Sequence, residues 1–395
     1  MQSKSEGLWE SARWVAAAMV LAGCAPTERG SAFDQATDGT PDATSTSGGG
    51  AEGSDASDGG IADEDSGGVK LDVSVPDSGV GDDCSDPDAP DCECVVELHP
   101  PCDDGTDDPF AAMGIGCGGG TVVSAESTGS PAAIGVRSGL GGTEAWAPTE
   151  GKRFAVIGSG NVAQLDSEPP TYADPFDLEF ELDFPSFCSD DLDGLDEGSG
   201  PLDPGTVPAP IVAAPAGGVD CLEDPTLVGL GDCSNSLQGQ LDQGTSVNDY
   251  TELRVELVVP NDATSLSYDF AFFSTEYPAY LGSTYNDLFV GWIESEAWTG
   301  NVSFDAQGNP ISLNAAFFDL QDDNGETAEL AGTCMRYHGA TRWLTSTTAV
   351  NPGETVELVL AVFDLSDSIL DSYVFVDNVR WGCEGTVRPG TTPVG

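Results

Sequence analysis

Apolar residues alternate with polar ones along the second half of the chain. Two stretches show it best, "TELRVELVVP" at 251–260 and "SLSYDFAFF" at 265–273. The apolar residues at every second position are Leu253, Val255, Leu257 and Val259, then Leu266, Tyr268, Phe270 and Phe272. A period of two places these side chains on one face of an extended chain, so both stretches are predicted to be β-strands with a buried face.

Further strands are predicted between turns rich in Gly, Asn and Asp. They fall within 152–165, 287–295, 301–314, 355–365 and 372–381. No long helical period appears, so we expect an all-β fold, an antiparallel, jelly-roll-like β-sandwich over residues 108–384. A Gly-, Pro- and acid-rich stretch at about 195–243 is expected to be an irregular insertion, and 385–395 a flexible tail.

The N-terminus shows a different pattern. "WVAAAMVLAG" at 14–23 is uncharged and mostly apolar but too short to span a bilayer, which takes about 20 residues. It follows Lys4 and Arg13, which predicts a secretory signal over 1–23. "LAGC", ending at Cys24, resembles the lipobox of bacterial lipoproteins, which implies lipidation of Cys24. The alternative is an ordinary signal peptide with a chance cysteine. Ala25, where an inner-membrane retention signal has Asp, favours the outer membrane.

Residues 24–83 are mostly Gly, Ser, Thr, Ala, Pro and Asp. Such a segment cannot bury enough apolar surface to fold, so it is predicted to be a disordered acidic tether. The whole chain has a formal net charge of −56, with 68 acidic residues and only 12 Lys and Arg. This charge excludes nucleic acid as a partner, because a phosphate backbone would be repelled. Divalent cations are the natural partners of dense carboxylates.

Eleven cysteines leave ten once Cys24 is assigned to the anchor. An exported chain lies in an oxidising compartment, so these ten are disulfide candidates. They are Cys84, Cys92, Cys94, Cys102, Cys117, Cys188, Cys221, Cys233, Cys334 and Cys383. A zinc site in the Cys-rich segment 84–107, which holds His99, is the alternative, but its spacing fits no common zinc module. Cys221 with Cys233 is the one pair we predict, as a local loop closure.

The stretch from Tyr268 to Ile293, "YDFAFFSTEYPAYLGSTYNDLFVGWI", resembles the choice-of-anchor L domain. The matching positions are Ser274, Glu276, Tyr277, Pro278, Asn286, Asp287 and Phe289. The resemblance extends over about 108–383 and departs at Arg342, where Gly is more usual, and in the acidic insertion. It implies an extracellular β-rich domain carried by different surface anchors, which agrees with the lipobox.

Two acidic clusters are candidate calcium sites, because calcium takes six to eight oxygen ligands from loops. One is Glu276 with Asn286 and Asp287, and the other is Asp364, Asp367 and Asp371. The alternative is that these side chains cap turns through bonds to the backbone. No organic cofactor is expected, since "VIGSGN" at 156–161 lacks the glycine spacing of a dinucleotide site.

No catalytic pattern stands out. His99 and His338 lie in no H-E-x-x-H motif, and no G-x-S-x-G motif occurs. We therefore predict a non-enzymatic lipoprotein, anchored to the outer membrane and surface-exposed, that binds a glycan or a protein, with calcium support. Aromatic residues for stacking on sugars would be Tyr280, Tyr285, Trp292 and Trp298, unless they fill the core. The alternatives are a secreted hydrolase with an Asp/Glu pair and a purely structural envelope lipoprotein.

Overall fold

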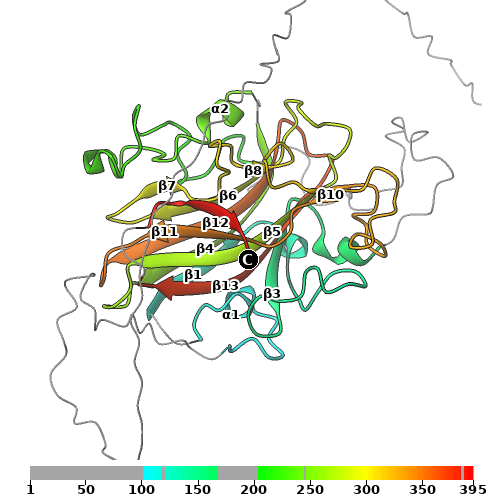
Figure 1. Ribbon diagram of the computed structural model, residues 1–395, viewed down its shortest axis with the longest axis horizontal. Coiled ribbons are helices and arrows are strands. Elements are labelled where there is room, and N and C mark those ends of the chain that lie inside the picture. Colours follow the sequence, from blue (N-terminus) through cyan, green and yellow to red (C-terminus); the bar gives the residue numbers. More distant parts are fainter. Residues whose placement is uncertain (1–100, 118–120, 168–202, 244–245, 384–386, 395) are drawn as a thin grey trace, which may run out of the picture. The chain divides into compact units, whose positions relative to one another are not determined.

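A computed structural model describes residues 101–117, 121–167, 203–243, 246–383 and 387–394 of the 395-residue chain. The predicted signal peptide, Cys24 and the predicted tether lie outside the described residues. Strands dominate the described part (Figure 1), and every strand pair is antiparallel. The predicted all-β sandwich is confirmed.

The first sheet has six strands in the order β1-β4-β12-β6-β7, with β8 also paired to β6. Their bounds are β1 Thr121–Thr128, β4 Val247–Val258, β6 Leu288–Glu294, β7 Thr299–Asn301, β8 Ile311–Ser312 and β12 Thr355–Leu365. Its centre is the pairing of β12 with β4 and β6, two strands far apart in sequence from β12. We call this sheet A.

The second sheet, sheet B, has eight strands in the order β14-β11-β5-β13-β3-β2, with β10 joining β5 to β9. Their bounds are β2 Ile134–Arg137, β3 Phe154–Gly158, β5 Ser265–Ser274, β9 Leu320–Gln321, β10 Gly339–Ala340, β11 Leu344–Ala349, β13 Ser372–Gly382 and β14 Gly390–Pro393. Residues 390–393, which the sequence placed in a flexible tail, pair with β11. Four backbone positions of an otherwise unpaired edge are thereby covered.

The main core lies between the two sheets. It includes all eight alternating apolar residues predicted from 251–260 and 265–273. Phe270 of sheet B and Phe289 of sheet A meet with ring centroids 4.8 Å apart. The period-two pattern therefore identified the inner faces of β4 and β5 correctly.

The outer faces of both sheets are also buried. Loops with Trp146, Leu330 and Trp343 cover sheet B, where they pack on Phe273 and Phe375. Residues 203–243 cover sheet A through Ile211 and Leu237, which pack on Trp292 and Phe363. We call residues 203–243 the strap. This second burial explains why nearly every residue of β5, β6 and β12 is buried, on the outer face as well as the inner one.

Helices are short. In the described residues the α-helices are α1, Pro109–Ala112, and α2, Gln238–Leu241, and the 3₁₀ turns are Pro131–Ala133, Val162–Asp166 and Pro225–Leu227. Asp108 caps α1 by accepting from the backbone N–H of Phe110. In the part of the chain that is described, no helix has the length and apolar character needed to cross a membrane.

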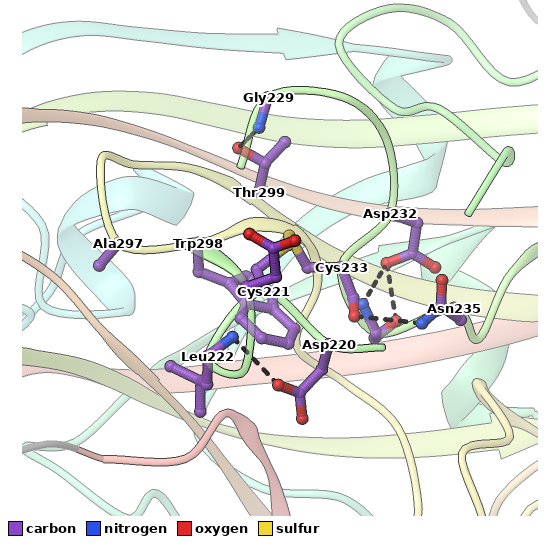
Figure 2. Close-up of a disulfide and its surroundings, with 12 residues drawn as sticks. Asp220, Cys221, Leu222, Gly229, Asp232, Cys233, Asn235, Ala297, Trp298 and Thr299 are labelled. Atoms are coloured by element: carbon purple, nitrogen blue, oxygen red, sulfur yellow. Dashed lines mark hydrogen bonds between the residues drawn. A yellow bond between two sulfur atoms is a disulfide. The ribbon is translucent and has the colours of Figure 1, made fainter. Parts of the chain in front are cut away.

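A disulfide joins Cys221 to Cys233 within the strap, as predicted. Figure 2 shows Trp298 beside this disulfide and Asp232 next to it. The Asp232 carboxylate accepts from the backbone N–H groups of Ser236, at 2.9 Å, and of Asn301 in β7, at 3.1 Å. The strap is thus closed on itself and bonded to the edge of sheet A.

A second disulfide joins Cys102 to Cys117, and Cys334 and Cys383 are also disulfide-bonded. Cys84, Cys92, Cys94 and Cys188 lie outside the described residues.

Candidate functional site

The two acidic clusters predicted from the sequence form one site. Glu276, Asn286 and Asp287 lie on the connection from β5 to β6, and Asp367 and Asp371 lie on the connection from β12 to β13. Both connections leave the sandwich at the same end. The backbone N–H of Thr275 donates to the carbonyl of Asp371, at 3.1 Å, so the two connections touch.

Asp364 enters this site from the end of β12. The register between β12 and β4 shifts between Val362 and Asp364, opposite Asp249 of β4, whose φ is +46°. A bulge of this kind redirects side chains near the end of a strand. Asp249 is one of the charged groups that act on Asp364, although the sequence analysis did not select it. We call Asp249, Glu276, Asp287, Asp364, Asp367 and Asp371 the acid site.

Burial and missing hydrogen bonds set the acid site apart from ordinary turn caps. Asp364 is fully buried, and within the described part of the chain neither of its carboxylate oxygens has a hydrogen-bond partner. Oδ1 of Asp287 and Oδ1 of Asn286 are likewise buried and unpartnered. The Asn286 amide nitrogen donates to Gln240 Oε1 of the strap, which leaves its oxygen free. Buried acceptors without donors are costly, because they lose water and gain nothing in exchange.

Burial also shifts the acidity of these groups. It raises the pKa of Glu276 to about 8, against a smaller opposing effect of the Asp287 backbone N–H. Burial raises the pKa values of Asp287 and Asp364 well above the ordinary Asp value, and the negative charge of a neighbouring carboxylate adds to each shift. Within the described residues, Glu276, Asp287, Asp364 and Asp367 form no ion pair. Such a site favours either bound protons or a bound cation.

The side chains of the acid site are not arranged as a complete set of metal ligands. Among the described residues, no group of three or more His, Cys, Asp or Glu side chains is arranged so that it could hold a metal ion. The donor set itself, carboxylates with one amide oxygen on loops and strand ends, is of the type that calcium takes. A bound ion would require these carboxylates to turn toward one another.

The glycine-rich turn "VIGSGN" supports the acid site structurally. Ser159 and Ser372 exchange two hydrogen bonds, each 2.9 Å long, which join the end of β3 to the start of β13. A Cβ on Gly160 would lie 1.8 Å from Oδ2 of Asp371. Only glycine lets the backbone pass this close to the carboxylate.

Aromatic residues are divided between the core and the rim of the site. Trp292 and Trp298 are buried, with exposures of 0% and 2%, so the interpretation of these two as exposed platforms is wrong. Loops and the strap cover them. Tyr285 is exposed and contacts the half-buried Tyr280 edge to face, with ring centroids 5.5 Å apart. Burial, followed by the charges of Asp367 and Glu276, raises the pKa of Tyr280.

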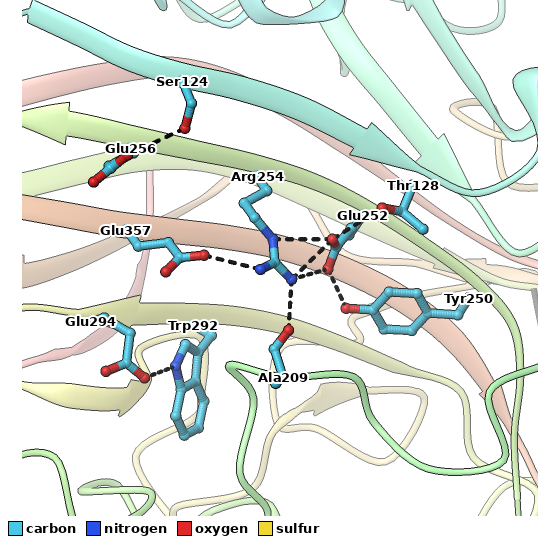
Figure 3. A network of polar contacts seen from close by, with 10 residues as sticks. All are labelled: Ser124, Thr128, Ala209, Tyr250, Glu252, Arg254, Glu256, Trp292, Glu294 and Glu357. Atoms are coloured by element: carbon cyan, nitrogen blue, oxygen red, sulfur yellow. Dashed lines mark hydrogen bonds and ion pairs between the residues drawn. The ribbon is translucent and has the colours of Figure 1, made fainter. Parts of the chain in front are cut away.

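A separate polar network lies on the outer face of sheet A (Figure 3). Arg254 of β4 forms ion pairs of 3.1 Å with Glu252 and with Glu357 of β12. One of its N–H groups also donates to the carbonyl of Ala209 in the strap. Glu357 stands directly opposite Glu294 of β6. Like charges in this position are unfavourable, and burial raises the pKa of Glu294.

The fold defines an antiparallel β-sandwich with an acid site at one end and loops over both outer faces. The family model of the choice-of-anchor L domain matches residues 223–379, which confirms the resemblance over these residues. The match begins in the strap and includes the acid site, and β1 to β3 lie before it in the same two sheets. It indicates a cell-surface-associated protein. No curated protein and no solved structure matches the chain.

Proposed function

We propose that this protein is a lipid-anchored cell-surface protein that binds a glycan or protein ligand at the acid-site end of its sandwich, with calcium held by the acid site. The observation that carries the proposal is Asp364, fully buried with both carboxylate oxygens unpartnered, among five other carboxylates. A cation is one of the two ways to compensate such charge, and the other is protonation.

The anchor part of the proposal rests on the sequence. Cys24 follows Leu21, Ala22 and Gly23, and the acidic segment after it would hold the sandwich away from an outer membrane. Mass spectrometry of the mature N-terminus tests this part. An acylated Cys24 as the first residue is expected, and an unmodified residue 24 or cleavage elsewhere would contradict the anchor.

Calcium binding is tested by thermal unfolding of the sandwich in chelator and in a calcium series. A ligand present at a hundred times its Kd stabilises the folded state by about 2.7 kcal/mol, which is a readily measured shift. The melting temperature should rise with calcium concentration and fall again when chelator is added. Magnesium is the matched comparison, since it needs a tighter octahedral site. An unchanged melting temperature across the series would remove calcium from the proposal. Protonation would then be the way in which the buried charge is compensated.

Ligand binding is tested on a glycan array and on a panel of envelope proteins, with and without calcium. Binding that requires calcium supports the proposal. Absence of binding to both sets would favour a purely structural envelope lipoprotein.

A second candidate function is hydrolysis, which the pair Glu294 and Glu357 favours. Among the described residues Glu294 forms no ion pair; it accepts from the Trp292 indole N–H at 2.8 Å, and burial raises its pKa, while Glu357 is paired with Arg254. Two opposed carboxylates with different surroundings are the arrangement of a general acid and a base. Turnover of a broad glycoside and ester panel, lost in Glu294→Gln, would establish it, and no turnover would remove it.

A further inference from the structure

Four large apolar residues on the two connections that carry the acids are exposed or half-buried, which is unusual for this chain. Leu281, Tyr285 and Ile369 are 54%, 39% and 50% exposed, and Tyr280 is half-buried beside Tyr285. They come from the two connections that carry the acids. The hydroxyl of Ser366 donates to the carbonyl of Thr284, at 3.4 Å, so these connections meet at the surface. We call Tyr280, Leu281, Tyr285 and Ile369 the apolar rim.

Negative charge acts on this rim. Asp367 is half-buried, and its charge and that of Glu276 act on the Tyr280 hydroxyl. The carbonyl of Asp367 accepts from the Asn248 side chain, at 2.8 Å, which fixes this part of the connection against the start of β4. The whole chain also has a formal net charge of −56, so the rim lies in a negative field with or without calcium.

The chemistry of the rim distinguishes between classes of ligand. A sugar ring is recognised by a flat aromatic face and by polar groups that bond to its hydroxyls. Here Tyr280 and Tyr285 are nearly perpendicular, at 76°, and the other two residues of the rim, Leu281 and Ile369, are aliphatic. An anionic surface would be repelled by the acids and by a net charge of −56. The rim combines tyrosine rings, aliphatic side chains and nearby carboxylates. An ammonium or guanidinium group on an apolar stem matches all three, because the cation interacts with tyrosine faces and with carboxylates while its methylenes cover aliphatic surface.

We infer that the ligand of this end of the sandwich is a segment of a partner protein in which a lysine or arginine is flanked by apolar residues, received by the apolar rim. The inference rests on the proposed binding function and names the class of partner. Complementary charge would also speed the encounter, since the whole domain attracts basic partners.

The test measures binding of two acetylated, amidated peptides by calorimetry in calcium and at moderate salt. One has a central lysine between leucines, and the other has norleucine in place of the lysine. Norleucine keeps the methylene chain and removes the charge, so the lysine peptide should bind about tenfold more tightly. Tyr285→Ala and Ile369→Ala should each weaken the lysine peptide several-fold. Leu230→Ala is the matched control, because Leu230 is 67% exposed but lies on the strap. This variant should bind the lysine peptide as tightly as the unaltered protein does.

Each other result has a defined meaning. Equal binding of the two peptides, absence of binding at millimolar peptide, or an equal loss in Leu230→Ala would overturn the inference. Binding of cello- or chito-oligosaccharides that is lost in Tyr285→Ala would also overturn it, yet would leave the proposed function standing. Failure of the calcium series affects only the proposed cation, because none of the rim variants changes a carboxylate.

Discussion

Ser372 at the start of β13 donates its hydroxyl to Oδ2 of Asp287, immediately before β6, at 2.6 Å. The bond joins sheet B to sheet A at the acid-site end, and both residues are buried. Among the described residues it is the one hydrogen bond that the Asp287 carboxylate accepts from a side chain, since Oδ1 has no partner there.

Ser372→Ala should therefore destabilise the fold by about 1–3 kcal/mol, because a buried carboxylate would lose its donor. Urea unfolding measures the change. Thr347→Ala, which removes a half-buried hydroxyl pair with Ser267 on the outer face of sheet B, is the control and should cost less. Equal losses of unfolding free energy in the two variants would mean that the bond to the Asp287 carboxylate stabilises the fold no more than an ordinary hydroxyl pair does.

Asp364→Asn should keep or raise the melting temperature in chelator, because it removes a buried charge that has no hydrogen-bond partner. The same variant should lose the stabilisation by calcium proposed above, about 2–3 kcal/mol at a hundred times the Kd. Asp262→Asn is the matched control, being exposed on the connection between β4 and β5 at the other end of the sandwich. A calcium shift that survives in Asp364→Asn would place the cation elsewhere.

Gly160→Ala should destabilise the domain by about 1–3 kcal/mol, because the new methyl group would overlap the Asp371 carboxylate. Thermal unfolding in chelator measures this. Gly142→Ala is the control, since a Cβ there meets nothing within 4 Å. If both variants unfold at the wild-type temperature, the turn has room that the structure does not show.

Asp377 on β13 should make stability depend on pH. Burial raises its pKa to about 7, although it accepts from the backbone N–H groups of Thr149 and Glu150. The folded state therefore holds the proton more tightly than the unfolded chain, whose pKa is near 3.8. Its stabilising contribution is complete below pH 3.8 and is lost as the pH rises to about 7.

Asp377→Asn should make the decline of stability between pH 4 and pH 7 less steep, as measured by urea unfolding in saturating calcium. Asp262→Asn should leave the slope unchanged, because that carboxylate is exposed. An unaltered slope in Asp377→Asn would show that the carboxylate is already ionised within the folded protein.

The strands were predictable because their apolar residues recur with a period of two. The pattern at 251–260 and 265–273 identified the inner faces of β4 and β5, and the motif around Glu276 indicated the family. The cysteine spacing also identified the pair Cys221 and Cys233, since a short loop can close without the rest of the fold. The sequence left open whether Trp292 and Trp298 stack on a ligand or fill the core, because nothing local to them shows that loops and the strap cover sheet A.

The sequence by itself determined the class of fold, the family resemblance and the six residues put forward as calcium ligands. These follow from local periodicity and from short motifs. Only the tertiary structure decided that two clusters about 80 residues apart are one site, that Asp249 belongs to it, and that Gly160 is needed beneath it. The reason is physical: antiparallel pairing across two sheets brings together the ends of strands that are distant in the chain, and burial then changes the chemistry of the carboxylates placed there.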